Sequence, residues 1–329
     1  MKRLFRGAFA LGLIVIVVLV VREGAHAIAV LLGRAGWRLL LLVPLHTVPL
    51  LLDVIGWRVL IFDRTRISSL FLIASIREAI NRLLPVANLG GEFVGIRLLS
   101  LKGISGATAT SSVIVEMVLN LAAQYLFFGL GLALLLHITG SVQGMGTLLI
   151  VFVGPLPVLA LFFWLLHSGA LFRILEKLGA KMLDPNPGQQ GSLSRLGQLD
   201  IAIRRLASAH SRLALGTLWQ LAGLITGCLE TWLALKWLGH PVSLPAAVTL
   251  ESITLAARSL IFFAPAGLGV QEAGLIGVGY LLGLGTDVAI ALSLAKRMRE
   301  ILFGLPALAA WQLIAHRSNC SKISRQNES

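Results

Sequence analysis

Charged residues are scarce in this chain of 329 residues. They make up 13% of the sequence, against about 25% in a soluble globular domain, while hydrophobic residues reach 57% and the mean hydropathy is +0.87. This shortage of charge excludes a soluble protein. The apolar residues form runs of about 18–25 separated by charges, whereas an outer-membrane barrel shows only a weak alternation. The composition therefore predicts an all-α polytopic membrane protein.

Cysteine and several enzyme motifs are also missing or rare. Cys228 and Cys320 lie in no CxxC or Cys/His pattern, so the sequence indicates neither a disulfide framework nor a metal site. The Gly-x4-Gly-Lys-Ser/Thr motif is absent, which excludes a self-contained ATP-driven pump. An Asp-rich motif for a metal-bound diphosphate is absent as well. We identify no catalytic residue and expect no cofactor.

Acidic residues are outnumbered, with 15 Asp and Glu against 28 Lys and Arg and a net charge of +13. The basic residues cluster at the ends of apolar runs, which favours membrane topology and anionic lipid headgroups over nucleic acid as partner. By the positive-inside rule we expect both termini and the loop 168–212 in the cytoplasm, and the uncharged segment 138–147 outside.

Six apolar segments are long enough to cross a bilayer. They are about 7–21, 39–61, 110–137, 148–166, 213–238 and 287–315. The first resembles a signal peptide but lacks a convincing cleavage site, and we expect it to be retained as a span. Residues 22–38 are either an interfacial helix or a loop with an aromatic anchor. Residues 316–329 form a polar tail that we expect to be disordered.

Two further apolar segments are interrupted by proline and glycine. The first break runs from Pro85 to Glu92 and the second from Pro265 to Glu272, so both breaks have the same proline-to-glutamate spacing. Their sequence numbers differ by a constant offset of 180. The arms that flank each break are too short to span a bilayer alone, since spanning needs about 20 residues. Each interrupted segment is therefore predicted to be a re-entrant helical hairpin.

The order of these segments predicts two inverted repeats in one membrane domain, residues 1–315. Residues 1–137 and 148–315 each contain two spans, a hairpin and a third span. Because three crossings reverse the direction of the chain, the second half is inverted relative to the first. Broken helices in corresponding places of two inverted halves are typical of transporters that expose one central site to either side.

Helix breaks in hydrocarbon are tolerated only against protein or a wet cavity, so we expect a polar centre between the hairpins. The half-helices that begin after the breaks present free N–H groups and the positive end of the helix dipole, which suit a phosphate or carboxylate. The guanidiniums of Arg82 and Arg258 suit the same anions. The predicted substrate-binding residues are Arg82, Asn88, Gly90, Gly91, Glu92, Glu116, Asn120, Arg258, Gly267, Gly269, Glu272, Lys296, Arg297, Arg299 and Glu300, with Pro85 and Pro265 as hinges.

Alternative roles remain open for several of these residues. Arg82 and Arg258 can instead close the hairpins by pairing with Glu92 or Glu272. The two glutamates can balance the helix dipole, or bind a proton or an amine.

Two polar features lie within predicted spans. Glu116, Asn120 and Gln124 share one helix face, and the offset of 180 places Glu116 opposite Lys296 as a predicted ion pair. Asp53 is either a functional residue or the cap of a helix broken at Pro49.

Several of these motifs together resemble a known family. They are Asn81–Pro85 with Gly90-Gly91-Glu92, Val115-Glu116, Pro265–Gly269 with Glu272, and the run Arg297–Leu302. On these residues the chain resembles the flippase-like membrane domain related to the transmembrane part of lysylphosphatidylglycerol synthases, and within that group the stand-alone members associated with hopanoid biosynthesis.

The resemblance implies a lipid flippase or transporter of the bacterial inner membrane. Its substrate would be a polar-headed lipid of phospholipid, aminoacyl-lipid or hopanoid type, and lipid-biosynthesis enzymes would be its partners. Two departures matter: Met117 follows Glu116 where family members often have arginine, and no soluble aminoacyl-transferase domain follows the last span. Lysyl transfer is therefore not expected. The alternatives are an intramembrane lipid-modifying transferase and a non-catalytic scaffold for lipid-biosynthesis enzymes.

Overall fold

The computed structural model describes residues 25–61, 65–84, 90–140, 152–153, 190–260 and 269–327. Every regular element in this part of the chain is a helix, so the predicted helical class is confirmed. The elements are α2 (Ala25–Ala35), the 3-10 helix η1 (Gly36–Leu41), α3 (Leu42–Leu60), α4 (Ile67–Leu83), α5 (Gly90–Leu101), α6 (Gly106–Thr139), α10 (Gln190–Ala207), α11 (His210–Trp237), α12 (Leu244–Leu260), α13 (Val270–Leu281) and α14 (Thr286–Asn327).

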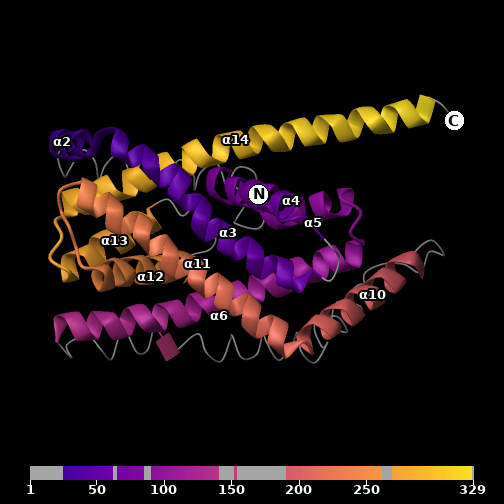
Figure 1. Ribbon diagram of the computed structural model, residues 1–329, viewed down its shortest axis with the longest axis horizontal. Helices are drawn as coiled ribbons and strands as arrows, with labels where there is room; N and C mark the ends of the chain where they lie inside the picture. Colours follow the sequence, from indigo (N-terminus) through magenta and orange to yellow (C-terminus); the bar gives the residue numbers. More distant parts are fainter. Residues whose placement is uncertain are drawn as a thin grey trace.

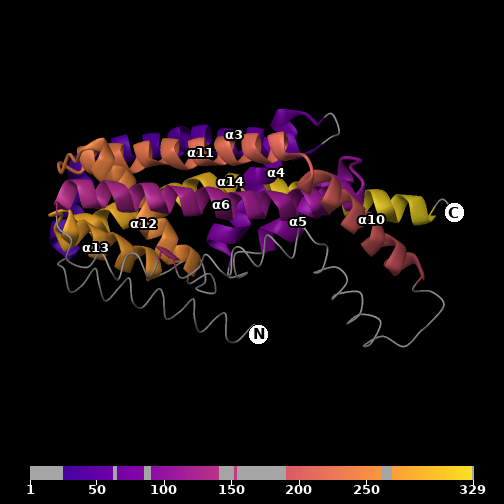
Figure 2. The same ribbon diagram turned by 90° about the horizontal axis from the view of Figure 1, so that it is seen from below.

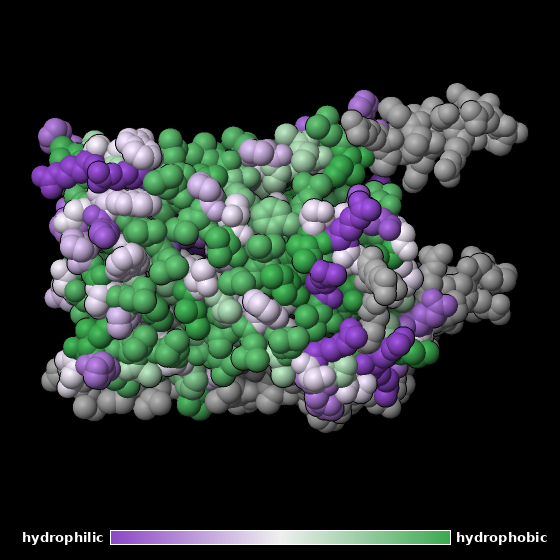
Figure 3. Space-filling model, in the orientation of Figure 1, coloured by the Kyte–Doolittle hydropathy of each residue, from purple (hydrophilic) through white to green (hydrophobic). Residues whose placement is uncertain are grey.

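Four helical segments among these residues are long and apolar enough to cross a membrane. They are Ile28–Leu60, Gly106–Thr139, His210–Trp237 and Thr286–His316. They coincide with four of the six predicted spans; the predicted span 7–21 and nearly all of 148–166 lie outside the described residues. Figure 3 shows apolar residues across the middle of the molecule and hydrophilic residues at both ends. A polytopic membrane protein accounts for this distribution.

Two predicted boundaries change. The chain is helical from Ala25, and η1 joins α2 to α3, so a loop at 22–38 is wrong for the described part of that segment. The polar tail was expected to be disordered, but α14 continues to Asn327. No proline or glycine occurs between His316 and Asn327 to end the helix, and this explains the extension.

The helices that flank the two breaks form similar pairs. α4 packs against α5, and α12 packs against α13; the first helix of each pair has 17 residues and the second has 12. The proline breaks themselves, with Pro85, Asn88, Pro265 and Gly267, lie outside the described residues. Figures 1 and 2 show α4 and α5 toward the end that carries the C-terminus and α12 and α13 at the opposite end.

The same turn follows α5 and α13. Gly103 and Gly283, which have the same offset as the two prolines, have φ of 88° and 75°, a left-handed conformation that glycine adopts without a Cβ penalty. The N–H of Ile104 bonds to the carbonyl of Leu99, and the N–H of Leu284 bonds to that of Gly279, so the hydrogen bonds also repeat at this offset. Each turn leads into the next long helix, α6 or α14.

The helix packing also repeats between the two halves, because each long helix that follows a hairpin packs against the first helix of the other hairpin. α6 packs against α12 of the other half, α14 packs against α4, and α3 packs against α11. Small residues allow the closest approach. A Cβ at Gly223 of α11 would lie 2.5 Å from the Asp53 carboxylate and 3.1 Å from the Pro49 carbonyl oxygen of α3. Interfaces between membrane helices use small residues for this purpose.

The α3–α11 contact yields a stability prediction. Gly223→Ala forces a methyl group against a backbone carbonyl, and we expect it to lower the free energy of unfolding by about 1–3 kcal/mol, as overpacking does. Gly227→Ala, one turn later, is the matched control, because its Cβ would meet nothing closer than Pro49 Cβ at 4.0 Å. Thermal unfolding in detergent measures both. Equal midpoints for the two variants would contradict this packing.

Candidate functional site

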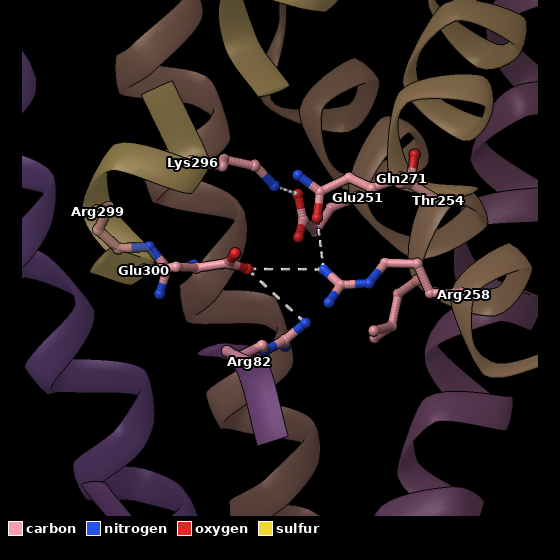
Figure 4. A pocket seen from close by; sticks show the side chains of 9 residues that line it. Arg82, Glu251, Thr254, Arg258, Gln271, Lys296, Arg299 and Glu300 are labelled. Atoms are coloured by element: carbon pink, nitrogen blue, oxygen red, sulfur yellow. Dashed lines mark hydrogen bonds and ion pairs between the residues drawn. The ribbon is translucent and has the colours of Figure 1, made fainter. Parts of the chain in front are cut away.

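Two arginines from different halves of the chain meet at one carboxylate. Arg82 and Arg258 lie in the last turns of α4 and α12, just before the two breaks. Their NH1 atoms lie 3.8 and 3.9 Å from the same oxygen, Glu300 Oε1 of α14 (Figure 4). Glu300 is 3% exposed. The alternative in which the arginines close their own hairpins by pairing with Glu92 or Glu272 does not occur among the described ion pairs.

Glu300 has two more cationic neighbours on its own helix. Arg297 NH1 lies 3.1 Å from its Oε2, and Arg299 NH2 lies 4.0 Å from its Oε1. One carboxylate therefore faces four guanidiniums. Three of the four distances exceed hydrogen-bonding range. Glu300 therefore offsets the positive charge of the guanidiniums and leaves some of their N–H donors without a hydrogen bond to it.

A cavity of about 50 Å³ lies at this junction. Four cationic and two anionic side chains line it, and Thr254 contributes a hydroxyl that has no hydrogen-bond partner in the described structure. The lining residues are Arg82, Glu251, Thr254, Leu255, Arg258, Gln271, Lys296, Arg299 and Glu300. In Figure 4 the charged side chains and Gln271 are directed toward one another from α4, α12, α13 and α14. The excess of cations makes this a place for an anion.

The predicted ion pair between Glu116 and Lys296 is wrong. Lys296 of α14 pairs with Glu251 of α12, which also accepts a hydrogen bond of 2.5 Å from Thr231. Glu116 of α6 pairs with Arg77 of α4 at 2.6 Å. Each long helix thus pairs with the hairpin of its own half. The long helix carries the acidic partner in the first half and the basic partner in the second.

At the start of α5, Glu92 holds the first hairpin together. It pairs with Arg77, which also lies 4.5 Å from the Trp57 ring centroid, and it accepts a bond of 3.2 Å from Asn81. The N–H of Gly91 donates to Asn81 Oδ1 at 2.8 Å. A Cβ at Gly91 would lie 2.4 Å from the Arg77 carbonyl oxygen. Gly91, next to Gly90, therefore permits close packing of α4 and α5.

Glu272 has the corresponding position in the second hairpin. Its Oε2 accepts from the N–H of Gly269 at 2.8 Å, and its Oε1 accepts from Ser293 at 2.7 Å. Arg297 Nε lies 3.6 Å away. Glu272 thus caps the start of α13, in agreement with the alternative that it balances the helix dipole.

The polar stripe on α6 and Asp53 lie apart from the cavity lining. Asn120 accepts a hydrogen bond from Gln124, which in turn accepts one of 2.6 Å from Ser259 of α12. Asp53 packs against Gly223, and one of its carboxylate oxygens has no partner in the described structure. Because α3 continues through Pro49, the interpretation of Asp53 as the cap of a broken helix is wrong.

A buried network around His46 was not predicted from the sequence. Its Nε2 lies 2.9 Å from Glu78, and its Nδ1 lies 2.8 Å from Glu230 and 2.5 Å from Arg299 NH1. These residues come from α3, α4, α11 and α14. The sequence signal was weak, because His46 and Glu230 are single titratable residues in apolar runs, whereas Glu78 and Arg299 stand beside other charged residues.

An apolar groove of about 440 Å³ lies between α3, α4 and α14. Its lining residues are Val43, Pro44, Thr47, Phe71, Leu72, Ser75, Leu302, Phe303, Pro306, Ala307 and Ala310. The Phe303 ring lies 5.0 Å from the His46 ring, edge to face. The groove therefore borders the buried polar network. Among the described residues, no group of three or more His, Cys, Asp or Glu side chains is arranged to hold a metal ion.

A family model, the lysylphosphatidylglycerol synthase TM region, matches residues 6–307. The chain belongs to the lysylphosphatidylglycerol synthase TM family. It matches no curated protein and no solved structure. Membership in this family indicates a lipid-related role in a membrane, and the matched residues include both helix pairs and all the lining residues of the cavity.

The observed pairing of Lys296 in this family member yields a second prediction. Lys296→Met leaves the Glu251 carboxylate uncompensated, and we expect a loss of about 3 kcal/mol in the free energy of unfolding. Adding Glu251→Gln to that variant should recover part of the loss. A double-mutant cycle from unfolding midpoints in detergent measures the coupling. Additive effects for this pair, with coupling instead between Lys296→Met and Glu116→Gln, would contradict the assignment.

Proposed function

We propose that this protein is a flippase or transporter that moves a polar-headed lipid across or out of the bacterial inner membrane. The observation that carries the proposal is the cationic cavity at the junction of the two hairpins, within a bundle of membrane-spanning helices. Arg82 and Arg258 approach it from the two halves and bind the headgroup, with Lys296 and Arg299 beside them. Membership in a lipid-related membrane family supports the same function.

The architecture that we propose has six full spans and two re-entrant hairpins in two inverted repeats, 1–137 and 148–315. The repeated turn at Gly103 and Gly283 supports it, and so does the location of the hairpins at opposite ends of the bundle (Figure 1). Both termini then face the cytoplasm. Inverted halves allow one central site to open to either side in turn.

The two cavities have sizes that fit different parts of a lipid. The cationic cavity, at about 50 Å³, holds a few water molecules, whereas ligand sites occupy about 300–1,000 Å³. In the proposed transport cycle this arrangement is a closed state, in which Glu300 holds Arg82 and Arg258 together. The apolar groove, at about 440 Å³, faces the hydrocarbon between α3, α4 and α14 and accommodates an acyl chain.

Opening follows from the same contacts. An anionic headgroup that enters between Arg82 and Arg258 competes with the Glu300 carboxylate for their donors. Bidentate contacts of arginine with phosphate are stronger than the long contacts of 3.8 and 3.9 Å seen here. The headgroup thus displaces Glu300 from both arginines and takes over the neutralisation of their charge.

A reconstituted translocation assay tests the proposal. Full-length protein in liposomes is given acyl-labelled fluorescent phosphatidylglycerol, and dithionite reduction measures exchange between leaflets. We expect protein-dependent exchange, and a decrease of at least about tenfold for Arg258→Ala, because a hydrogen bond to a charged group contributes about 1.5–3 kcal/mol. Arg97→Ala on the exposed face of α5 is the matched control and should keep full activity.

The alternatives give different outcomes in the same assay. An intramembrane transferase changes the covalent mass of the lipid, which mass spectrometry detects. A scaffold shows no lipid exchange, either as wild type or as Arg258→Ala. Absence of exchange for anionic, zwitterionic and hopanoid probes, with correctly folded protein, would overturn the translocation function.

A further inference from the structure

Charged groups from three neighbouring helices contact His46. Its side chain is 13% exposed and lies between Glu78 of α4, Glu230 of α11 and Arg299 of α14. On its own helix, Asp53 lies about two turns after His46. α6 contributes Glu116, which pairs with Arg77, and η1 contributes the exposed Arg38.

The two ring nitrogens of His46 have different partners. Nε2 lies 3.0 and 2.9 Å from the two oxygens of Glu78, so this nitrogen carries a proton whether the ring is neutral or charged. Nδ1 lies 2.8 Å from a Glu230 oxygen, which can only accept a hydrogen bond, and 2.5 Å from Arg299 NH1, which can only donate one.

These two contacts of Nδ1 exclude each other. Neutral His46 has a lone pair on Nδ1 and accepts a hydrogen bond from Arg299. Protonated His46 donates from Nδ1 to Glu230 and loses its attraction for the guanidinium. The ring therefore has two arrangements that differ by one proton and by its bond to Arg299.

Arg299 connects the protonation state of His46 to the cationic cavity. It lines that cavity, and its NH2 lies 4.0 Å from Glu300, the carboxylate that holds Arg82 and Arg258. Its Nε also lies 3.3 Å from Glu230. When His46 takes up a proton, Glu230 gains a second cationic partner and Arg299 loses an acceptor. The charge of Arg299 is then available to an anion in the cavity.

We propose that His46 is a proton-binding site that couples lipid translocation to a proton gradient, with one proton and one anionic lipid moving together. This inference rests on the proposed function and adds its driving force. Linkage fixes the sign: an anion in the cavity attracts Arg299, frees Nδ1 and favours protonation, so protonation favours anion binding by the same factor. Lower pH thus strengthens binding of the lipid anion.

A pH gradient across proteoliposomes of full-length protein tests the coupling, with acyl-labelled fluorescent phosphatidylglycerol as probe. Because a single proton contributes a factor of ten per pH unit, we expect the probe to accumulate up to tenfold in the alkaline-side leaflet for one unit of gradient. His46→Gln should exchange the probe without accumulation. The exposed His240→Gln should behave as wild type. If His46→Gln does not fold, Glu230→Gln replaces it as the test variant. We then expect the probe to accumulate well below tenfold.

A second measurement separates failure of the coupling from failure of the proposed function. Nuclear magnetic resonance of protein labelled at histidine Cε1, in detergent, follows one resonance that is lost in His46→Gln. The coupling predicts that phosphatidylglycerol raises the pH at which this resonance titrates. A shift with lipid but no exchange in liposomes supports the proton site and overturns translocation. Exchange that no gradient biases, with a resonance that lipid does not shift, overturns the coupling.

Discussion

The contact of Glu300 with arginines from both hairpins is the interaction on which the rest of the site depends. It joins α4 of the first half to α12 of the second through α14, and it neutralises guanidiniums that hydrocarbon would otherwise make very costly. A buried carboxylate surrounded by cations at 3.1–4.0 Å links the two hairpins, and in the proposed mechanism another anion replaces it. The proposed recognition of a headgroup thus depends on the same charges that stabilise this junction.

Around this contact, the polar residues form three groups with different tasks. Glu92 and Glu272 hold the starts of α5 and α13, through Arg77 and Gly269 respectively. The cavity residues face one another at the junction of the hairpins. The His46 network joins α3 and α11 to α14 through Arg299. Under the proposed function, separate groups would let the hairpins keep their internal structure while the contact between them changes.

Much of the fold was predictable because apolar runs and helix breakers depend on local sequence alone, and the positions of Arg82 and Arg258 followed from the breaks. The partners were not predictable. The constant offset in sequence number relates equivalent positions in the two halves, but Glu116 and Lys296 each pair within their own half, a choice that packing decides. His46, Glu78 and Glu230 lie in three separate helices with no common spacing, so only the tertiary structure brings them together.

The most direct measurement is a cryo-electron microscopy structure of the full-length protein in nanodiscs of phosphatidylglycerol. Our account predicts headgroup density between Arg82 and Arg258, with the Glu300 carboxylate displaced from both and an acyl chain in the groove of α3, α4 and α14. Lipid density confined to the outer surface of the bundle, with Glu300 still between the two arginines in every class, would contradict a headgroup site at this junction.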